Sequence, residues 1–132
     1  MNMKTDFILI DDDPVFNFLN EKIVGAAPCA RQVVAYDSPT EALNQIKGLA
    51  DSGELSGVIF LDVQMPVMNG FQFLAQLEKI SLDKVKNAHV YMLTSSIDEG
   101  DRTKAKAYSL VKGFLNKPLT EDMMAKICAS VA

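Results

Sequence analysis

FILIDDD, residues 7–13, places three adjacent carboxylates directly after a run of four apolar residues. An apolar run normally enters a core, and adjacent like charges repel, so these carboxylates either cap a helix at the surface or bind a cation. A second run of this kind, VIFLD at residues 58–62, also ends in an acid. Runs that are apolar at nearly every position are typical of strands buried on both faces of a parallel sheet.

Five apolar runs of this type alternate with segments of helical spacing. The predicted strands are residues 7–10, 32–36, 58–61, 90–93 and 113–115. Between them, apolar residues recur at helical intervals, as at Val15, Leu19 and Ile23. Ser38 and Ser96 each begin a pattern that is typical of a helix N-terminus. This alternation predicts an α/β domain, with a parallel sheet covered by helices on both faces.

The composition fits one globular domain and gives no support to several other classes. The chain has 132 residues and a net charge of −4, without a basic block that would favour nucleic-acid binding. No apolar run reaches the ~20 residues that a membrane span needs. Cys29 and Cys128 form no CxxC pattern, and we expect both to be free thiols in a reducing compartment. We therefore expect one cytoplasmic domain, residues 1–132, with no output domain and no nucleic-acid or membrane partner.

Polar side chains follow four of the predicted strands. They are Asp11 and Asp12, then Asp62, then Thr94 and Ser95, and finally Lys117 with Pro118. Ligands of open parallel sheets bind outside the carboxyl ends of the strands, and a strand order of 2-1-3-4-5 would make these four strands neighbours. Carboxylates suit Mg²⁺, and a hydroxyl and an ammonium suit phosphoryl oxygens. The pattern therefore predicts a phosphoryl site, while Asp13, followed by Pro14, is interpreted as a helix cap.

These residues resemble those of the response regulator receiver family of two-component signalling, typified by the chemotaxis protein CheY. Residues 62–70, DVQMPVMNG, have the family's D-x-x-M-P-x-x-x-G pattern, and the other motifs follow in family order. The resemblance covers essentially the whole chain. It implies a (βα)5 flavodoxin-like, doubly wound sheet of five parallel strands in the order 2-1-3-4-5.

The resemblance also implies a role for each site residue. Asp62 is the expected phosphoacceptor, and the expected Mg²⁺ ligands are Asp11, Asp12, Asp62 and the backbone carbonyl of Gln64. Thr94, Ser95 and Lys117 are expected to bind the phosphoryl group, and Thr94 and Phe114 to form a switch. Pro66, Gly70 and Pro118 are expected to shape the site, with a cis peptide bond before Pro118.

The implied function is signalling without an enzymatic activity beyond the chain's own phosphorylation and dephosphorylation. A sensor histidine kinase or a histidine phosphotransfer protein is the expected donor to Asp62, with Mg²⁺ as cofactor. The downstream protein target is expected to bind the face formed by the fourth helix, the fifth strand and the fifth helix. The fourth-helix segment, residues 98–108, has few large apolar residues, as a loosely held element would.

Three alternatives involve the same residues. Residues 11–15 also fit the D-x-D-x-[TV] motif of haloacid-dehalogenase-like phosphatases, but that interpretation leaves Asp62 and its flank unexplained. A flavodoxin-like FMN-binding protein would need a phosphate-binding loop rich in Ser, Thr and Gly where this chain has three acids. A receiver fold that binds proteins without being phosphorylated stays open on the sequence alone.

Overall fold

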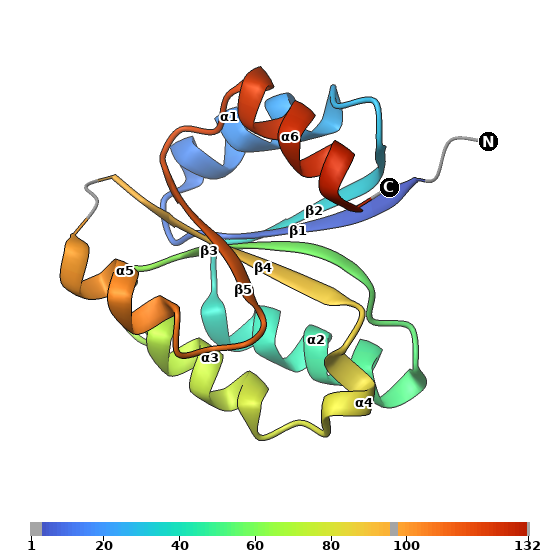
Figure 1. Ribbon diagram of the computed structural model, residues 1–132, viewed down its shortest axis with the longest axis vertical. Coiled ribbons are helices and arrows are strands. Elements are labelled where there is room, and N and C mark those ends of the chain that lie inside the picture. Colours follow the sequence, from blue (N-terminus) through green and yellow to red (C-terminus); the bar gives the residue numbers. More distant parts are fainter. Residues whose placement is uncertain (1–3, 96–97, 132) are drawn as a thin grey trace.

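Five parallel strands form one sheet in the order β2-β1-β3-β4-β5 (Figure 1). The computed structural model describes residues 4–95 and 98–131. The strands are β1 (Thr5–Ile10), β2 (Ala30–Tyr36), β3 (Gly57–Asp62), β4 (Ala88–Thr94) and β5 (Val111–Asn116). The predicted α/β class, the doubly wound topology and the strand order are therefore confirmed.

Helices cover both faces of the sheet. One face carries α1 (Pro14–Gly25) and α6 (Glu121–Val131), and the other carries α2 (Pro39–Ser52), α3 (Gly70–Glu78), α4 (Leu82–Val85) and α5 (Glu99–Ala105) (Figure 1). Strict alternation predicts a single helix between β3 and β4, whereas both α3 and the one-turn helix α4 lie there. The predicted fourth and fifth helices are consequently α5 and α6.

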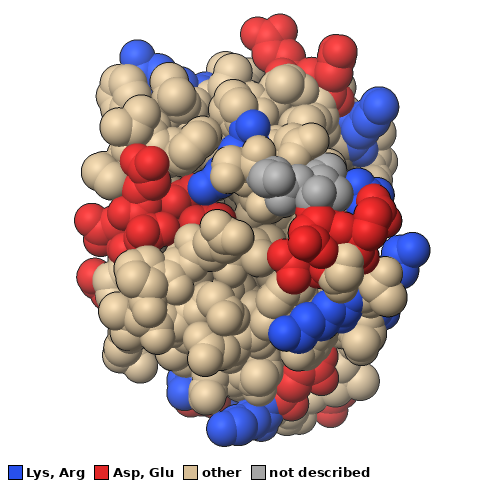
Figure 2. All heavy atoms as spheres, turned by 90° about the vertical axis from the view of Figure 1, so that its left-hand side faces the viewer, with Lys and Arg blue, Asp and Glu red and all other residues tan. Residues whose placement is uncertain are grey.

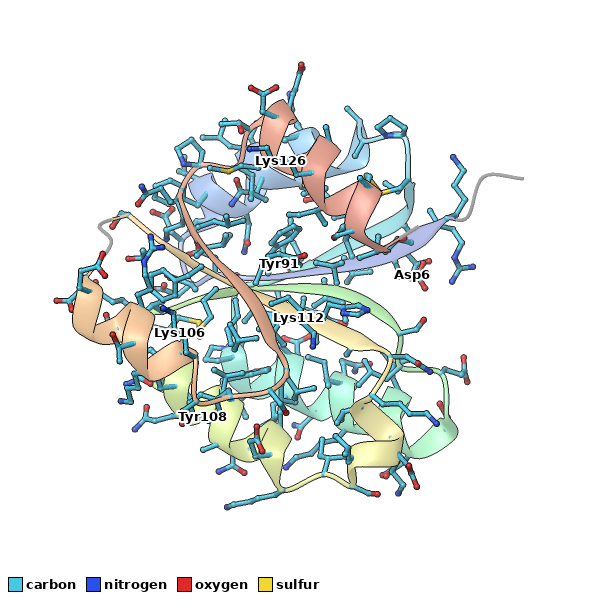
Figure 3. The ribbon with its side chains drawn as sticks, in the orientation of Figure 1. Asp6, Tyr91, Lys106, Tyr108, Lys112 and Lys126 are labelled. Carbon is cyan, nitrogen blue, oxygen red and sulfur yellow. A yellow bond between two sulfur atoms is a disulfide. The ribbon has the colours of Figure 1, made fainter. Side chains whose placement is uncertain are left out.

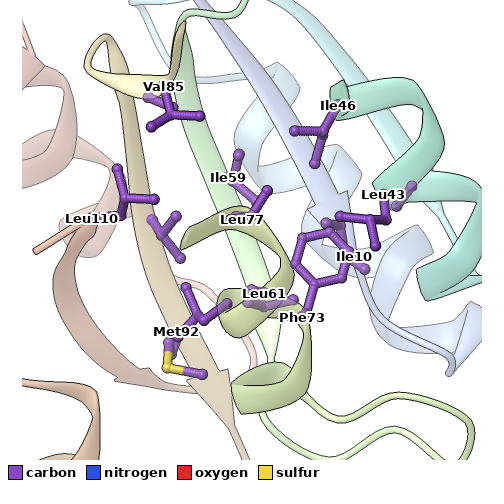
Figure 4. Packing of buried hydrophobic residues seen from close by; sticks show 14 of the residues in the cluster. Ile10, Leu43, Ile46, Ile59, Leu61, Phe73, Leu77, Val85, Met92 and Leu110 are labelled. Carbon is purple, nitrogen blue, oxygen red and sulfur yellow. The ribbon is translucent and has the colours of Figure 1, made fainter. Parts of the chain in front are cut away.

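The core has two layers, one on each side of the sheet. Between the sheet and helices α2 and α3 lies a cluster that includes Ile46, Ile59, Leu61, Phe73 and Met92 (Figure 4). On the other side, Phe7, Val58, Phe60, Met124 and Ile127 belong to a second cluster beneath α1 and α6. Successive residues of β3 thus enter opposite layers, which explains why its sequence is apolar at every position rather than at every second one.

Helix caps follow the sequence in two of three predicted places. The side chain of Asp13 accepts a hydrogen bond from the Val15 N–H, with Pro14 as the first helical residue, and Ser38 caps α2 through the Glu41 N–H. Helix α5, however, is capped by Asp98, whose Oδ1 accepts from the two backbone N–H groups that follow Glu99. The predicted cap Ser96 lies outside the described residues.

The buried face of α1 is not its apolar stripe. Val15 and Leu19 are exposed and Ile23 is half-buried against the second core cluster, whereas Asn17, Asn20 and Val24 are buried. The two asparagines bond backbone groups of neighbouring loops, which makes polar side chains the better partners for this part of the core. An apolar-periodicity argument finds the helix here but selects the wrong face.

The prediction of two free thiols is wrong. Cys29 and Cys128 form a disulfide, with Cα atoms 5.6 Å apart (Figure 3). The two residues are separated by 99 positions, so their spacing gives no sign of pairing. They meet because α6 runs from the carboxyl ends of the strands back toward the amino ends, where Cys29 precedes β2.

Within the described residues, no helix is both long enough and apolar enough to cross a membrane.

Candidate functional site

Three carboxylates from the ends of two neighbouring strands meet at one edge of the sheet. Asp11 follows β1 and Asp62 ends β3, and these side chains belong to residues only 3% and 4% exposed. Asp12 is exposed beside them, and one oxygen from each of the three carboxylates lies within 4.8 Å of the others. Figure 2 looks onto this edge and shows acidic side chains gathered on it, with basic atoms between them.

Local hydrogen bonds fix the turn that carries the first two acids. Asp11 Oδ1 accepts from the Asp13 N–H at 2.9 Å, and the Asn17 side-chain amide donates to the Asp11 carbonyl at 2.8 Å. The same amide group donates to the carbonyl of Tyr36 at the end of β2. The bond from the Asp13 N–H fixes the Asp11 carboxylate, and the two bonds from Asn17 fix the backbone of the turn that carries it.

Lys117 brings its ammonium group between the two buried carboxylates. Its Nζ lies 2.9 Å from Asp11 Oδ2 and 3.4 Å from Asp62 Oδ1, and its side chain is 6% exposed. The predicted cis peptide bond between Lys117 and Pro118 is present, and the Lys117 N–H donates to the Thr94 carbonyl at 2.8 Å. The lysine is thus anchored to β4 while it reaches across to β1 and β3.

The segment after Asp62 bends closely around that residue. The Gln64 N–H donates to Asp62 Oδ1 at 3.3 Å, and the Gly70 N–H donates to the Val63 carbonyl at 2.9 Å. A Cβ on Gly70 would lie 2.7 Å from the Asp62 carbonyl oxygen, closer than real contacts allow. Glycine at this point therefore lets α3 start against the end of β3, while the metal-ligand role of the Gln64 carbonyl stays a prediction.

The remaining predicted residues lie in or after β3, β4 and β5, with different exposure. Thr94 ends β4 and is buried, and Ser95 follows it and is exposed. Phe114 is half-buried in β5 and packs against the core cluster that includes Phe73. Pro66 is exposed in the loop after β3. The phosphoryl-binding and switching roles assigned to them stay predictions.

Burial changes the acidity of the central carboxyl group. Loss of hydration, and then the charge of Asp11, raise the pKa of Asp62 to about 7, although Lys117 acts in the opposite direction. Burial lowers the pKa of Lys117, but its hydrogen bond to Asp11 and the charges of both acids more than offset this, so the net shift is upward. Three carboxylates around one ammonium leave an excess of negative charge that a divalent cation with oxygen ligands would offset.

Two features of the site have no counterpart in the sequence prediction. The ring of Phe16 lies over Lys117, with its centroid 4.2 Å from Nζ. Asn20 accepts a hydrogen bond from the Leu119 N–H and so ties α1 to the chain just after the cis peptide bond. Asn17 and Asn20 recur at helical spacing among apolar residues, a signal that could have marked this helix face as a polar one.

The pKa of Asp62 predicts how stability depends on pH. In metal-free protein, the folded chain binds a proton at Asp62 more tightly than the unfolded chain between pH 3.8 and about 7. The stability gained from this proton is complete below that window and is lost as pH rises through it. Asparagine cannot ionise, so its contribution does not change with pH. The free energy of unfolding of Asp62→Asn, relative to that of the wild type, should therefore rise by about 2 kcal/mol from pH 5 to pH 8, measured by urea unfolding in EDTA.

The exposed acid Asp37 provides a matched control, because it lies just after β2 at the same edge of the sheet. We expect Asp37→Asn to track the wild type across this range. A difference between Asp62→Asn and the wild type that does not vary with pH would contradict the prediction.

Comparison with known proteins agrees with this geometry. Residues 7–129 match the family described as the response regulator receiver domain. A two component response regulator from Cytophaga hutchinsonii superposes with a TM-score of 0.89 at 29% identity, covering 97% of each chain. The chemotaxis protein CheY4 of Vibrio cholerae gives a TM-score of 0.75 at 25% identity, covering 98% of this chain and 99% of that one.

Curated relatives show the same similarity over part of their length. A protein-glutamate methylesterase/protein-glutamine glutaminase of Dechloromonas aromatica is 31% identical over 143 residues, covering 100% of this chain but 38% of that protein. A second protein of that name, from Vibrio vulnificus, is 35% identical over 80 residues, 61% of this chain and 22% of its own length. The chain thus spans less than two fifths of the length of these relatives.

The fold and the strand-end residues together define a doubly wound α/β signalling domain of the CheY-like class. The chain belongs to the response regulator receiver family, and its relatives are receivers of two-component systems. Receiver domains generally bind Mg²⁺ and interact with histidine kinases or phosphotransfer proteins and with downstream targets.

Proposed function

We propose that this receiver accepts a phosphoryl group on Asp62, with Mg²⁺ held by Asp11, Asp12, Asp62 and the backbone carbonyl of Gln64. The observation that carries the proposal is the meeting of three carboxylates within 4.8 Å of one another beside the buried ammonium of Lys117. A structural ion pair would need one acid for one base. Here two buried acids contact one base and a third, exposed acid lies beside the two, which suits a site that takes up further positive charge.

The chemistry is a displacement at phosphorus. A carboxylate oxygen of Asp62 attacks the phosphorus of a phosphohistidine, the P–N bond breaks, and the imidazole leaves and takes up a proton. Bound Mg²⁺ would offset the carboxylate charge and polarise the phosphoryl oxygens. Lys117 offers its ammonium to one of these oxygens, and Thr94 and Ser95 lie at the adjacent strand end to bind others. The product is a mixed anhydride of Asp62, which water can later hydrolyse.

The proposed partners act at two separate surfaces. The donor is a histidine kinase or a histidine phosphotransfer protein, which must reach the carboxyl edge of the sheet. The downstream protein binds the face formed by α5, β5 and α6, where Arg102, Lys106, Lys112 and Phe114 line a cavity of about 220 Å³ (Figure 3). We further propose that residues 1–132 form a single receiver domain that works in the cytoplasm, with no enzymatic output of its own.

The test is intact mass after incubation with acetyl phosphate. We expect the wild type to gain one phosphoryl group in Mg²⁺ and none in EDTA, and Asp62→Asn to gain none in either. Failure of the wild type to gain mass, even when the adduct is trapped within seconds, would favour a binding module that works without phosphorylation. A label that survives Asp62→Asn but disappears in Asp11→Asn would instead favour the phosphatase-like chemistry.

A further inference from the structure

Two carboxylates and one aromatic ring lie against the ammonium of Lys117. Asp11 Oδ2 and Asp62 Oδ1 lie 2.9 Å and 3.4 Å from Nζ, and the third neighbour is the ring of Phe16, 4.2 Å away at its centroid. The Lys117 side chain is 6% exposed, so water reaches it poorly. A cation over an aromatic face is attracted most strongly when it is desolvated in this way.

The position of Phe16 is set by the turn that also sets the site. Asp13 caps α1 and Pro14 occupies its first position, so Phe16 lies in the first turn of the helix. The next residue, Asn17, donates to the Asp11 carbonyl. The ring and the carboxylate that bind Lys117 from two sides therefore belong to one hydrogen-bonded unit.

Two other Lys–Phe pairs in the described part of the chain show what is particular about this one. Lys22 lies over Phe18 at 4.6 Å on the solvent side of α1, where Phe18 is 58% exposed. Lys104 lies over Phe71 at 4.4 Å, and Lys104 is also exposed. Only the pair with Phe16, among these three, holds a lysine that also contacts the carboxylates of the site.

The charged partners of Lys117 are the carboxylates that the proposed cation would also bind. Before phosphoryl transfer, a divalent cation would offset the charge of Asp11 and Asp62 and so weaken the attraction that holds the ammonium at the site in the structure. The attraction of a neutral ring does not depend on the charge of these carboxylates.

We propose that Phe16 is a positioning residue for Lys117, which keeps the ammonium beside Asp62 once the carboxylates no longer hold it. This inference rests on the proposed function, because it gives Phe16 a part in phosphoryl transfer to Asp62. Phe16 acts through Lys117 and does not itself touch the reacting atoms. A side chain of similar size without a ring would fill the space but would not attract the ammonium.

The contact has a direct spectroscopic signature. The ring current of Phe16 should shift the Hε signals of Lys117 upfield in carbon–proton correlation spectra, both in EDTA and with Mg²⁺. We expect Phe16→Leu to return these signals to ordinary lysine values and Phe16→Tyr to retain the shift. The matched control Phe18→Leu makes the same change two positions along α1, at the solvent-exposed pair, and should leave Lys117 unchanged.

The same variants test the functional part with acetyl phosphate as a donor that needs no partner protein. We expect Phe16→Leu to be phosphorylated about three- to tenfold more slowly than the wild type in saturating Mg²⁺, with Phe16→Tyr restoring the rate. Phe18→Leu should react at the wild-type rate. Phe16 is half-buried, so the fold of each variant has to be checked. We expect the circular dichroism spectra of all three variants to match that of the wild type.

The outcomes separate this inference from the proposed function. A wild-type protein that gains no phosphoryl group would refute the proposed function, while the Lys117 spectrum would still show whether the contact exists. Unshifted Lys117 signals in the wild type, or an undiminished rate in Phe16→Leu, would overturn the positioning role. An equal loss of rate in Phe16→Leu and Phe16→Tyr would show that the shape of the side chain matters rather than its ring, and would overturn it as well.

Discussion

Replacing Lys117 by methionine is expected to slow phosphorylation of Asp62 by acetyl phosphate about 10²–10³-fold, the usual cost of removing one donor to a developing oxyanion. Methionine keeps much of the length and the apolar stem of lysine but offers no positive charge and no hydrogen bond. The lost group is one that the structure holds within 3.4 Å of Asp62, on a side chain that solvent scarcely reaches.

A second effect of the same substitution acts through the proton on Asp62. In the metal-free protein Lys117 lowers the pKa of that carboxyl group, against the raising effects of burial and Asp11, so its removal should favour the protonated and non-nucleophilic form. Bound Mg²⁺ would oppose this protonation. Rates at pH 7 and pH 9 in saturating Mg²⁺ therefore measure mainly the loss of the phosphoryl contact.

Rates should be measured by intact mass at both pH values in saturating Mg²⁺, with two further variants. Lys47→Met removes an exposed lysine from α2 and should react like the wild type. Lys117→Arg retains the charge but presents a planar fork of different reach, so we expect it to stay folded and to remain slow. A rate for Lys117→Met within twofold of the wild type at pH 9 would show that Lys117 is a structural counter-ion and would remove it from the reaction.

The strand ends explain why so much of this site could be predicted from the sequence. Each of the runs FILI, VIFL and VYML is apolar throughout because both faces of the central strands are covered, and the residue that follows each run must lie at one edge of the sheet. Asp11, Asp62 and Thr94 follow from that rule, and Lys117 follows the fifth strand at the same edge. The structure brings Lys117 within ion-pair distance of Asp11 and Asp62. Their chemical roles go beyond geometry and stay proposals.

What the sequence could not provide depends on contacts between distant positions. Phe16 and Lys117 are far apart in the sequence, as are Asn20 and Leu119, so spacing could not reveal that these pairs are in contact. Apolar periodicity selects the largely exposed stripe of α1, because it assumes that a buried face is apolar. The one-turn helix α4 is too short to produce a periodic signal.

The bond between Cys29 and Cys128 belongs to the same class of contacts, and its reduction should have the largest effect on stability. A disulfide mainly restricts the unfolded chain, and the restriction grows with the length of the loop that it closes. Here the cysteines are 99 positions apart. For a loop of this length we expect reduction to cost about 3–5 kcal/mol and to lower the melting temperature by about 10–15 °C.

The reduced protein should nevertheless remain folded at 25 °C, because other contacts hold α6 against the sheet. The side chains of Met124 and Ile127 on α6 are buried in the core layer below the helix, and just before the helix the Leu119 N–H donates to Asn20. Near its end, the hydroxyl groups of Tyr91 and Ser130 lie 3.3 Å apart (Figure 3). Survival without the disulfide is what work in a reducing cytoplasm would require, since thiols are kept reduced there.

Calorimetry with and without a dithiol reductant measures the effect, and iodoacetamide labelling under native conditions reports the thiols. The double variant Cys29→Ser, Cys128→Ser is the control, since it should melt near the reduced wild type and should not respond to reductant. Phosphorylation by acetyl phosphate at 25 °C should be nearly the same in all three forms, because the disulfide lies at the end of the sheet opposite Asp62. Two labelled thiols in protein purified without reductant would contradict the bond itself. The disulfide stabilises the fold by restricting the unfolded chain. A melting temperature that reduction does not change would instead show that the unfolded chain is equally restricted without the disulfide.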